Sequence, residues 1–122
     1  MKLAFDPEGG FLNGKRLFNA AFNKRWEECK DIILTSPNLN YGFRSGYYGS
    51  TPFLVVCMRG NVEVAEMMLA RMPPNIINAT DAAGFSALDD AIEKDHNDLI
   101  KLLEDNGGKS FFYTKQANGE WK

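Results

Sequence analysis

Apolar side chains recur at helical spacing in three stretches of the chain, and each stretch has two parts separated by a short polar turn. In the middle stretch, residues 53–58 are apolar on every side, which predicts a helix packed between neighbours. The part that follows carries one apolar stripe, which predicts a second helix with a single buried face. This stripe consists of Val62, Ala65, Met68 and Leu69. A single helix pair could not bury its apolar faces alone, so the pattern predicts helix pairs that stack on one another.

The stretches are copies of one another at a nearly fixed interval. Thr51-Pro52-Phe53 opens the middle copy, and Ser86-Ala87-Leu88 opens the next one 35 residues later. An earlier copy begins near Lys15. Thr51 and Ser86 are suited to cap a helix, because a hydroxyl accepts a hydrogen bond from an unpaired first-turn N–H group. Ser86 and Asp89 also have the spacing of a capping box, so the repeated unit is predicted to be a helix, a tight turn and a helix.

These residues resemble the ankyrin repeat. The resemblance rests on TPF at 51–53, GNVEVAEMML at 60–69, INATDAAGFSAL at 77–88 and LLEDNGG at 102–108. It implies an all-α fold, an ankyrin-repeat solenoid of stacked helix-turn-helix pairs joined by β-hairpin-like loops. Two positions depart from the family pattern: Leu54 and Asp89 stand where the family usually has histidine.

The resemblance implies one ankyrin-repeat domain over residues 1–122. Its repeats are expected at approximately 14–40, 50–78 and 85–108, followed by a C-terminal capping tail at 109–122. The tail resembles the opening hairpin of a fourth repeat, and we expect Phe111, Phe112 and Trp121 to cover the exposed end of repeat three. The alternative is a chain cut from a longer array of repeats.

The charge of the chain argues against two classes of partner. The net charge is −2, whereas nucleic acids and anionic membranes require a basic surface. The charge is unevenly distributed: residues 1–61 carry 8 Lys and Arg against 5 Asp and Glu, and residues 62–122 carry 6 against 11. The acidic half is either a solvated surface or a surface that steers a partner with a basic patch.

Few residues could carry catalysis or bind a metal. The only histidine, His96, falls at a structural turn position in the resemblance, and without it no Ser/His/Asp or Cys/His set can be assembled. Cys29 and Cys57 lie within helical patterns and are expected to be buried reduced thiols. We therefore expect no enzymatic activity, no cofactor and no metal site. The N-terminus does not resemble a signal peptide, and no apolar run is long enough to span a bilayer, so the expected location is cytoplasmic, or nuclear, and not secretory.

The resemblance also implies where a partner would bind, because such stacks use their loop tips and the exposed face of the first helix of each repeat. Transferred to this sequence, these positions are Phe22, Asn23, Tyr47, Tyr48, Ser50, Met58, Arg59, Ala82, Ala83, Phe85, Glu93 and Lys94. The loop before Thr51 is longer than its counterpart before Ser86, and the extra residues include Tyr41, Phe43 and Arg44. A loop enriched in Tyr, Arg and Gly is typical of a binding surface. The alternative is that its aromatic side chains fold back onto the first repeat.

These observations predict a protein-interaction module, an adaptor, scaffold or inhibitor that grips a partner protein through its concave face and its extended aromatic loop. The alternative is a structural segment of a larger ankyrin-repeat protein, with contacts mainly along the stack. We expect no binding of nucleic acid or membrane, and a monomer or a weak homo-oligomer.

Overall fold

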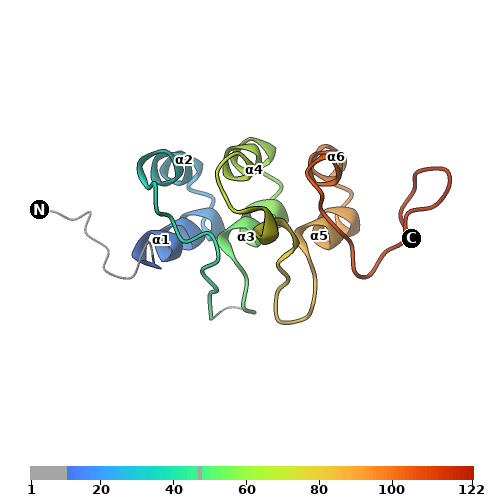
Figure 1. The fold of residues 1–122 in the computed structure, drawn as a ribbon, viewed down its shortest axis with the longest axis horizontal. Coiled ribbons are helices and arrows are strands. Elements are labelled where there is room, and N and C mark those ends of the chain that lie inside the picture. The colour runs from blue at the N-terminus through green and yellow to red at the C-terminus, as the bar shows by residue number, and fades with distance from the viewer. Residues whose placement is uncertain (1–10, 47) are drawn as a thin grey trace, which may run out of the picture.

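The computed structural model describes residues 11–46 and 48–122, and these form three helix pairs in a row (Figure 1). The helices are α1 (Phe11–Phe22), α2 (Trp26–Thr35), α3 (Pro52–Met58), α4 (Val62–Leu69), the 3-10 helix η1 (Pro74–Asn78), α5 (Ala87–Glu93) and α6 (Asn97–Asp105). The first helices of the pairs, α1, α3 and α5, contact one another in one layer, and α2, α4 and α6 do so in a second layer. The loops that join the pairs extend from the α1–α3–α5 layer, on the side away from the second layer (Figure 1).

The predicted capping residues start the helices where the sequence places them. The Thr51 hydroxyl accepts a hydrogen bond from the Leu54 N–H group at 3.2 Å, and Pro52 follows at the first helical position, where an N–H group would be unpaired. Ser86 and Asp89 form the predicted capping box at the start of α5. Local side-chain chemistry therefore sets the start of the first helix in the second and third repeats.

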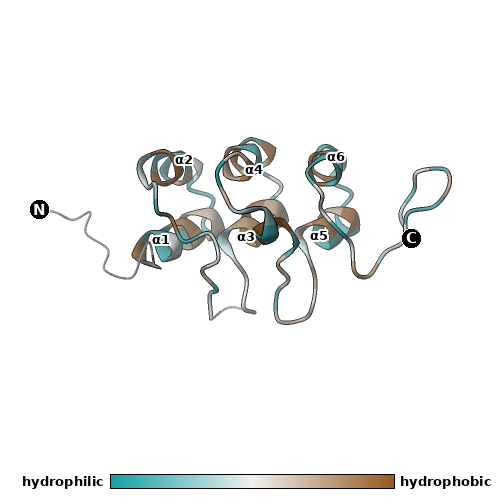
Figure 2. Ribbon diagram, in the orientation of Figure 1, coloured by the Kyte–Doolittle hydropathy of each residue, from teal (hydrophilic) through white to brown (hydrophobic). Residues whose placement is uncertain are grey.

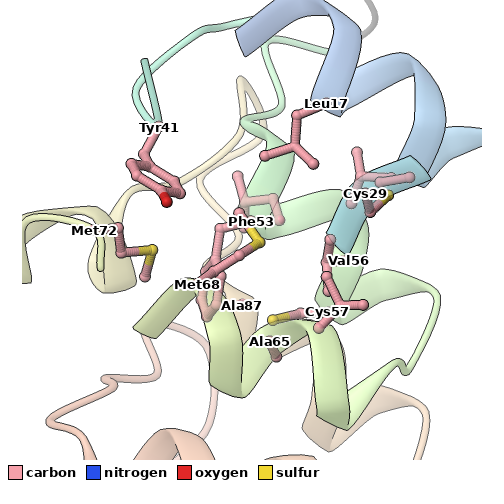
Figure 3. Close-up of a cluster of buried hydrophobic side chains, with 14 of the residues drawn as sticks. Leu17, Cys29, Tyr41, Phe53, Val56, Cys57, Ala65, Met68, Met72 and Ala87 are labelled. Carbon is pink, nitrogen blue, oxygen red and sulfur yellow. The ribbon is translucent and has the colours of Figure 1, made fainter. Parts of the chain in front are cut away.

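The core runs through all three pairs and is deepest around α3. All side chains from Pro52 to Cys57 are buried, as predicted for a helix that packs between neighbours, and α3 contacts α1, α4 and α5. Figure 3 shows Phe53 in the middle of this cluster, between side chains contributed by other helices. Figure 2 shows apolar residues concentrated on the helices, whereas the C-terminal tail is largely polar.

His96 has the structural position that the sequence predicts. It precedes α6, and its imidazole ring packs against Gly60, in the inter-helix turn of the preceding repeat. Gly60 has a φ of +78°, and a Cβ atom there would lie 2.9 Å from Cε1 of His96. Glycine is therefore required at this turn both for its backbone conformation and for the space that the ring fills.

The buried side chain of Asp89 holds the C-terminal tail against the third pair. Its carboxylate accepts hydrogen bonds from the Ser110 hydroxyl at 2.5 Å and from the N–H groups of Phe111 and Phe112 at 3.0 and 3.2 Å. The same carboxylate accepts from the Ser86 N–H group in the capping box. Asp89, which replaces the histidine usual in the family, thus serves both the start of α5 and the docking of the tail.

The expectation for the tail is correct for one aromatic residue and wrong for two. Trp121 is partly buried and packs against the core, as predicted. Phe111 and Phe112 remain 55% and 52% exposed, so they do not seal the end of repeat three. The reason is that their main-chain N–H groups, rather than their side chains, face Asp89.

The structure confirms an all-α repeat fold. Within residues 11–46 and 48–122 the only β-type pairing is the isolated bridge between Lys115 and Trp121. The finer expectation, a solenoid whose loops resemble β-hairpins, stays a prediction. In this described part of the chain, no helix is both long enough and apolar enough to cross a membrane.

Candidate protein-binding surface

The C-terminal ends of α1, α3 and α5 supply equivalent positions, one per repeat, that line up along the stack. The first is Phe22 and Asn23, the second Met58 and Arg59, and the third Glu93 and Lys94. Asn23, Glu93 and Lys94 are exposed, whereas Phe22, Met58 and Arg59 are partly buried. The structure therefore brings these predicted residues into one row, although half of them offer only part of their surface.

The contact between Arg59 and Phe22 explains this partial burial. The Arg59 Nη2 atom donates a hydrogen bond to the main-chain oxygen of Phe22 at 2.7 Å, and the guanidinium carbon lies 5.0 Å from the centroid of the Phe22 ring. The Phe22 ring in turn stacks on Phe18. A cation over an aromatic ring is attracted to its π face. Arg59 therefore links the first two repeats.

Tyr41 and Phe43, predicted as contact residues of the long loop, lie in the core instead. They are 7% and 9% exposed, and Phe43 packs against Phe18 with 6.2 Å between ring centroids. Burial also raises the pKa of the Tyr41 hydroxyl. The prediction that these side chains are exposed is wrong, because the loop folds back onto the helices. Figure 3 shows Tyr41 beside Met72, near the cluster around Phe53.

The remainder of the long loop is fixed to the next loop by hydrogen bonds. The Arg44 Nη1 atom donates to the main-chain oxygens of Gly49 at 2.8 Å and Thr80 at 2.6 Å. The Ala82 N–H group donates to the main-chain oxygen of Tyr48 at 2.8 Å. Arg44 is exposed, as predicted, and it also joins its own loop to the next one. Tyr47, the remaining predicted aromatic residue of this loop, lies outside the described residues.

Tyr48 is the most exposed aromatic side chain in the described part of the loop. It is 66% exposed, and its φ of +58° places it in the left-handed region, which residues other than glycine seldom adopt. The cost of this conformation is offset by the hydrogen bonds that fix the loop around it. The neighbouring Ala82 and Ala83 are also exposed, and Ser50 is partly so.

Phe85 belongs to the same row of loops but is partly covered. Its ring stacks on Phe112 of the tail with 4.2 Å between centroids. Phe112 therefore extends the surface beyond Phe85, and its neighbour in sequence, Phe111, is also exposed, although the sequence analysis assigned both to the end of the stack. The signal that could have found them is Asp89, because a buried carboxylate requires N–H or O–H donors, and the nearby tail offers several.

The carboxyl group of Asp90, on α5, has a raised pKa. Asp90 is partly buried, and burial raises the pKa of its carboxyl group to about 6, with a further upward contribution from Asp81, Glu93 and Asp89. The ammonium group of Lys94 opposes this rise. The folded protein therefore carries a carboxylate that is costly to keep charged at neutral pH.

Replacing Asp90 by asparagine is expected to stabilise the protein at pH 7.5. The pKa of the carboxyl group is about 6 in the folded state, against an ordinary value of 3.8 for aspartate, so the folded state holds the proton more tightly. The wild-type protein consequently gains stability from this group as the pH falls through 6, and the gain is complete below the unfolded pKa. After allowance for solvent screening, the stabilisation by Asp90→Asn at pH 7.5 is about 1 kcal/mol.

Urea unfolding of both proteins between pH 4.5 and 7.5, monitored by circular dichroism, measures this difference. The advantage of Asp90→Asn is expected to shrink as the pH falls. The control is Asp31→Asn, at an exposed position on α2, which changes the net charge equally. An advantage of Asp90→Asn that is independent of pH, or that Asp31→Asn reproduces, would contradict the assignment.

The described residues offer no arrangement for metal binding. No three His, Cys, Asp or Glu side chains among residues 11–46 and 48–122 lie where they could hold one ion. Cys29 and Cys57 are both free and buried, and burial raises the pKa of the Cys29 thiol to about 11. Burial also raises the pKa of the Cys57 thiol, with a smaller contribution from Asp90. Both thiols are therefore poor nucleophiles in the folded chain.

Comparison with known proteins agrees with this architecture. A family model described as ankyrin repeats, in three copies, matches residues 17–112 and so covers most of the chain. No curated protein sequence matches the chain. Three stacked helix pairs, the capped first helices and this match have one explanation: the chain belongs to the ankyrin-repeat family.

Proposed function

We propose that this chain is a protein-interaction module, an adaptor, scaffold or inhibitor, that holds a partner protein against its loop tips and the aligned ends of α1, α3 and α5. Ankyrin repeats are in general non-enzymatic protein-interaction modules, and the family assignment supports that class. The choice of surface rests on this chain's own residues.

The observation that carries the proposal is a set of exposed aromatic side chains on the loop before α3 and on the C-terminal tail, with the partly covered Phe85 on the loop between them. Tyr48, Phe111 and Phe112 are 66%, 55% and 52% exposed. Large apolar groups exposed together mark interaction sites in soluble proteins, and aromatic side chains supply much of the contact energy at interfaces. The stacking of Phe112 on Phe85 joins the tail to the loop before α5, which suits one continuous partner surface.

This set is also held rigidly, which favours binding. Arg44 links the first two loops, the Ala82 N–H group donates to the oxygen of Tyr48, and Phe112 stacks on Phe85. A surface that is ordered before binding loses less conformational entropy when a partner arrives. The alternative function, a segment of a larger ankyrin-repeat protein with contacts mainly along the stack, does not require aromatic side chains on the loops.

The double variant Tyr48→Ala with Phe111→Ala is expected to reduce capture of the partner from a lysate of the source cells by about tenfold, because it removes two interface anchors. Its melting temperature is expected to stay close to that of the wild type, since both side chains are more than half exposed. Quantitative mass spectrometry of the captured proteins, alongside calorimetry, measures both effects.

The matched control is Leu34→Ala on α2, which removes a side chain that is 61% exposed from the other layer of the stack. It is expected to capture the partner as the wild type does. Equal recovery by all three proteins, or a large fall in the melting temperature of the double variant, would overturn the choice of surface.

A further inference from the structure

A cleft of about 560 Å³ lies between the third helix pair and the C-terminal tail. In Figure 1 the tail turns back beyond α5 and α6 at the C-terminal end of the stack. The apolar lining comes from Ile92 of α5, Ile100 of α6, and Tyr113 and Trp121 of the tail. Because Tyr113 and Trp121 also pack against the core, this wall of the cleft is anchored. The cleft shares Glu93 with the row of first-helix ends, but none of Tyr48, Phe85, Phe111 and Phe112 lines it.

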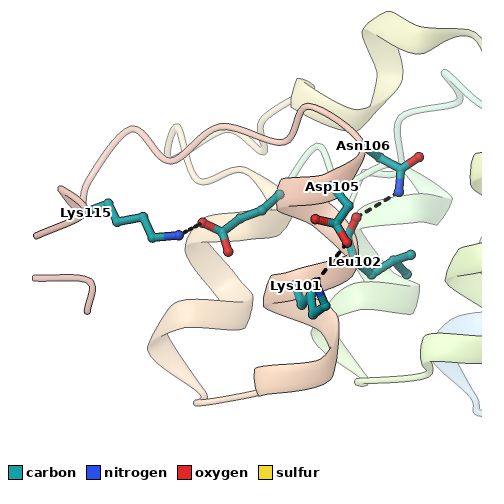
Figure 4. A network of polar contacts seen from close by, with 6 residues as sticks. Lys101, Leu102, Asp105, Asn106 and Lys115 are labelled. Carbon is teal, nitrogen blue, oxygen red and sulfur yellow. Dashed lines mark hydrogen bonds and ion pairs between the residues drawn. The ribbon is translucent and has the colours of Figure 1, made fainter. Parts of the chain in front are cut away.

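The polar lining of this cleft is strongly acidic. It includes Glu93, Asp95, Glu104 and Glu120, against a single cationic side chain, Lys122. Glu104 is already paired, since the Lys115 ammonium group lies 2.6 Å from its Oε2 atom (Figure 4). In the described part of the chain no ion pair neutralises the other three carboxylates. The cleft therefore combines an apolar floor with an excess of negative charge.

The contacts of Lys115 illustrate how a carboxylate and an aromatic ring beside this cleft bind a cationic side chain. The ammonium group of Lys115 is bound to Glu104 and also lies 5.8 Å from the centroid of the Trp121 ring. This pairing of a carboxylate with an aromatic face is an arrangement that attracts Lys and Arg side chains. Within the same cleft, Glu93, Asp95 and Glu120 offer further carboxylates beside Tyr113 and the apolar floor.

We infer that this cleft binds a segment of a partner protein in which a Lys or Arg residue stands beside an apolar residue. The apolar side chain would pack on Ile92 and Ile100, and the cationic side chain would face Asp95 and Glu120. Charge complementarity selects this occupant, because the carboxylates repel phosphate groups of nucleic acids and of anionic lipids. The site goes beyond the proposed function, since it lies between the third helix pair and the tail, uses none of the loop aromatics and takes a partner of defined chemistry.

The test uses a library of random short peptides displayed on phage, panned against the full chain. Enriched peptides are expected to carry Lys or Arg beside an aliphatic or aromatic residue. Their dissociation constants are then measured by fluorescence anisotropy for the wild type and for Asp95→Asn with Glu120→Gln. Loss of the two carboxylates is expected to weaken binding about tenfold, and added salt to weaken binding to the wild type.

The control Asp31→Asn with Glu66→Gln changes the net charge equally, at exposed positions on α2 and α4, and is expected to bind as the wild type does. The variant Tyr48→Ala with Phe111→Ala is also expected to retain the peptides, which separates this site from the proposed loop surface. Failure to enrich any peptide, enrichment of peptides without basic residues, or equal weakening by both charge variants would overturn the inference. Self-association of the wild type in sedimentation that Asp95→Asn with Glu120→Gln abolishes would overturn it as well, because a second copy of the chain would then occupy the cleft.

Discussion

Replacing Phe53 by alanine is expected to lower the free energy of unfolding by about 3–5 kcal/mol, the range measured when a large buried side chain is removed from a core. Phe53 is 0% exposed and lies on α3, the helix that contacts α1, α4 and α5. Its loss would leave a cavity where three repeats meet (Figure 3). Because domains of this size are stable by only about 5–15 kcal/mol, the variant is expected to lose much of its stability.

Urea unfolding followed by circular dichroism measures this loss. Phe53→Leu, which keeps most of the apolar volume, is expected to be less destabilised than Phe53→Ala. The surface control Leu34→Ala is expected to change the free energy of unfolding by less than about 0.5 kcal/mol. A loss below about 1 kcal/mol for Phe53→Ala would mean that the three pairs do not share one core around α3.

The helices and the core could be predicted from the sequence because their signals are local. Thr51 and Ser86 cap the helices that follow them, within the same turn. The unbroken apolar run of α3 also predicts its burial directly, since a helix with no polar face must have neighbours on all sides. The repeat interval then places the pairs beside one another without any further information.

The contact surface could be predicted only in part, because a loop has no periodicity that separates buried from exposed positions. Tyr41, Phe43 and Tyr48 belong to one loop and have similar chemistry. Two are buried, and the third is 66% exposed. Their burial depends on how the loop crosses the first two helix pairs, which is set by contacts with residues distant in sequence, such as Phe18. Composition indicated correctly that the loop is aromatic but could not show which side chains face outward.

The docking of the tail on Asp89 could not be predicted either, because it also depends on residues distant in sequence. The sequence shows both its capping-box spacing to Ser86 and its departure from the family's histidine. The groups that it binds in the tail are 21 to 23 residues later in the chain. A buried carboxylate must find donors, but the sequence does not state where they are.

Replacing Asp89 by alanine is expected to destabilise the protein by about 3 kcal/mol and to release the tail. The change removes the acceptor for the Ser86 N–H group, the Ser110 hydroxyl and the N–H groups of Phe111 and Phe112. Hydrogen bonds to charged groups contribute about 1.5–3 kcal/mol each, although some of these donors would regain water. Hydrogen exchange of the amides at 110–113, followed by mass spectrometry, is expected to accelerate strongly, while the amides of α3 stay protected.

Two companion variants separate the tail from the cap. Ser110→Ala removes the hydroxyl that donates to Asp89 and accepts from the Tyr113 N–H group, and it leaves the capping box intact. It is therefore expected to accelerate exchange at 110–113 with a smaller loss of stability than Asp89→Ala. Asp90→Asn, which alters the adjacent carboxylate, is expected to leave tail exchange unchanged. If Asp89→Ala loses stability but exchange at 110–113 does not change, Asp89 would be a helix cap alone. If exchange rises as predicted, Asp89 also holds the start of the tail, the segment that leads into Tyr113 and the tail wall of the acidic cleft.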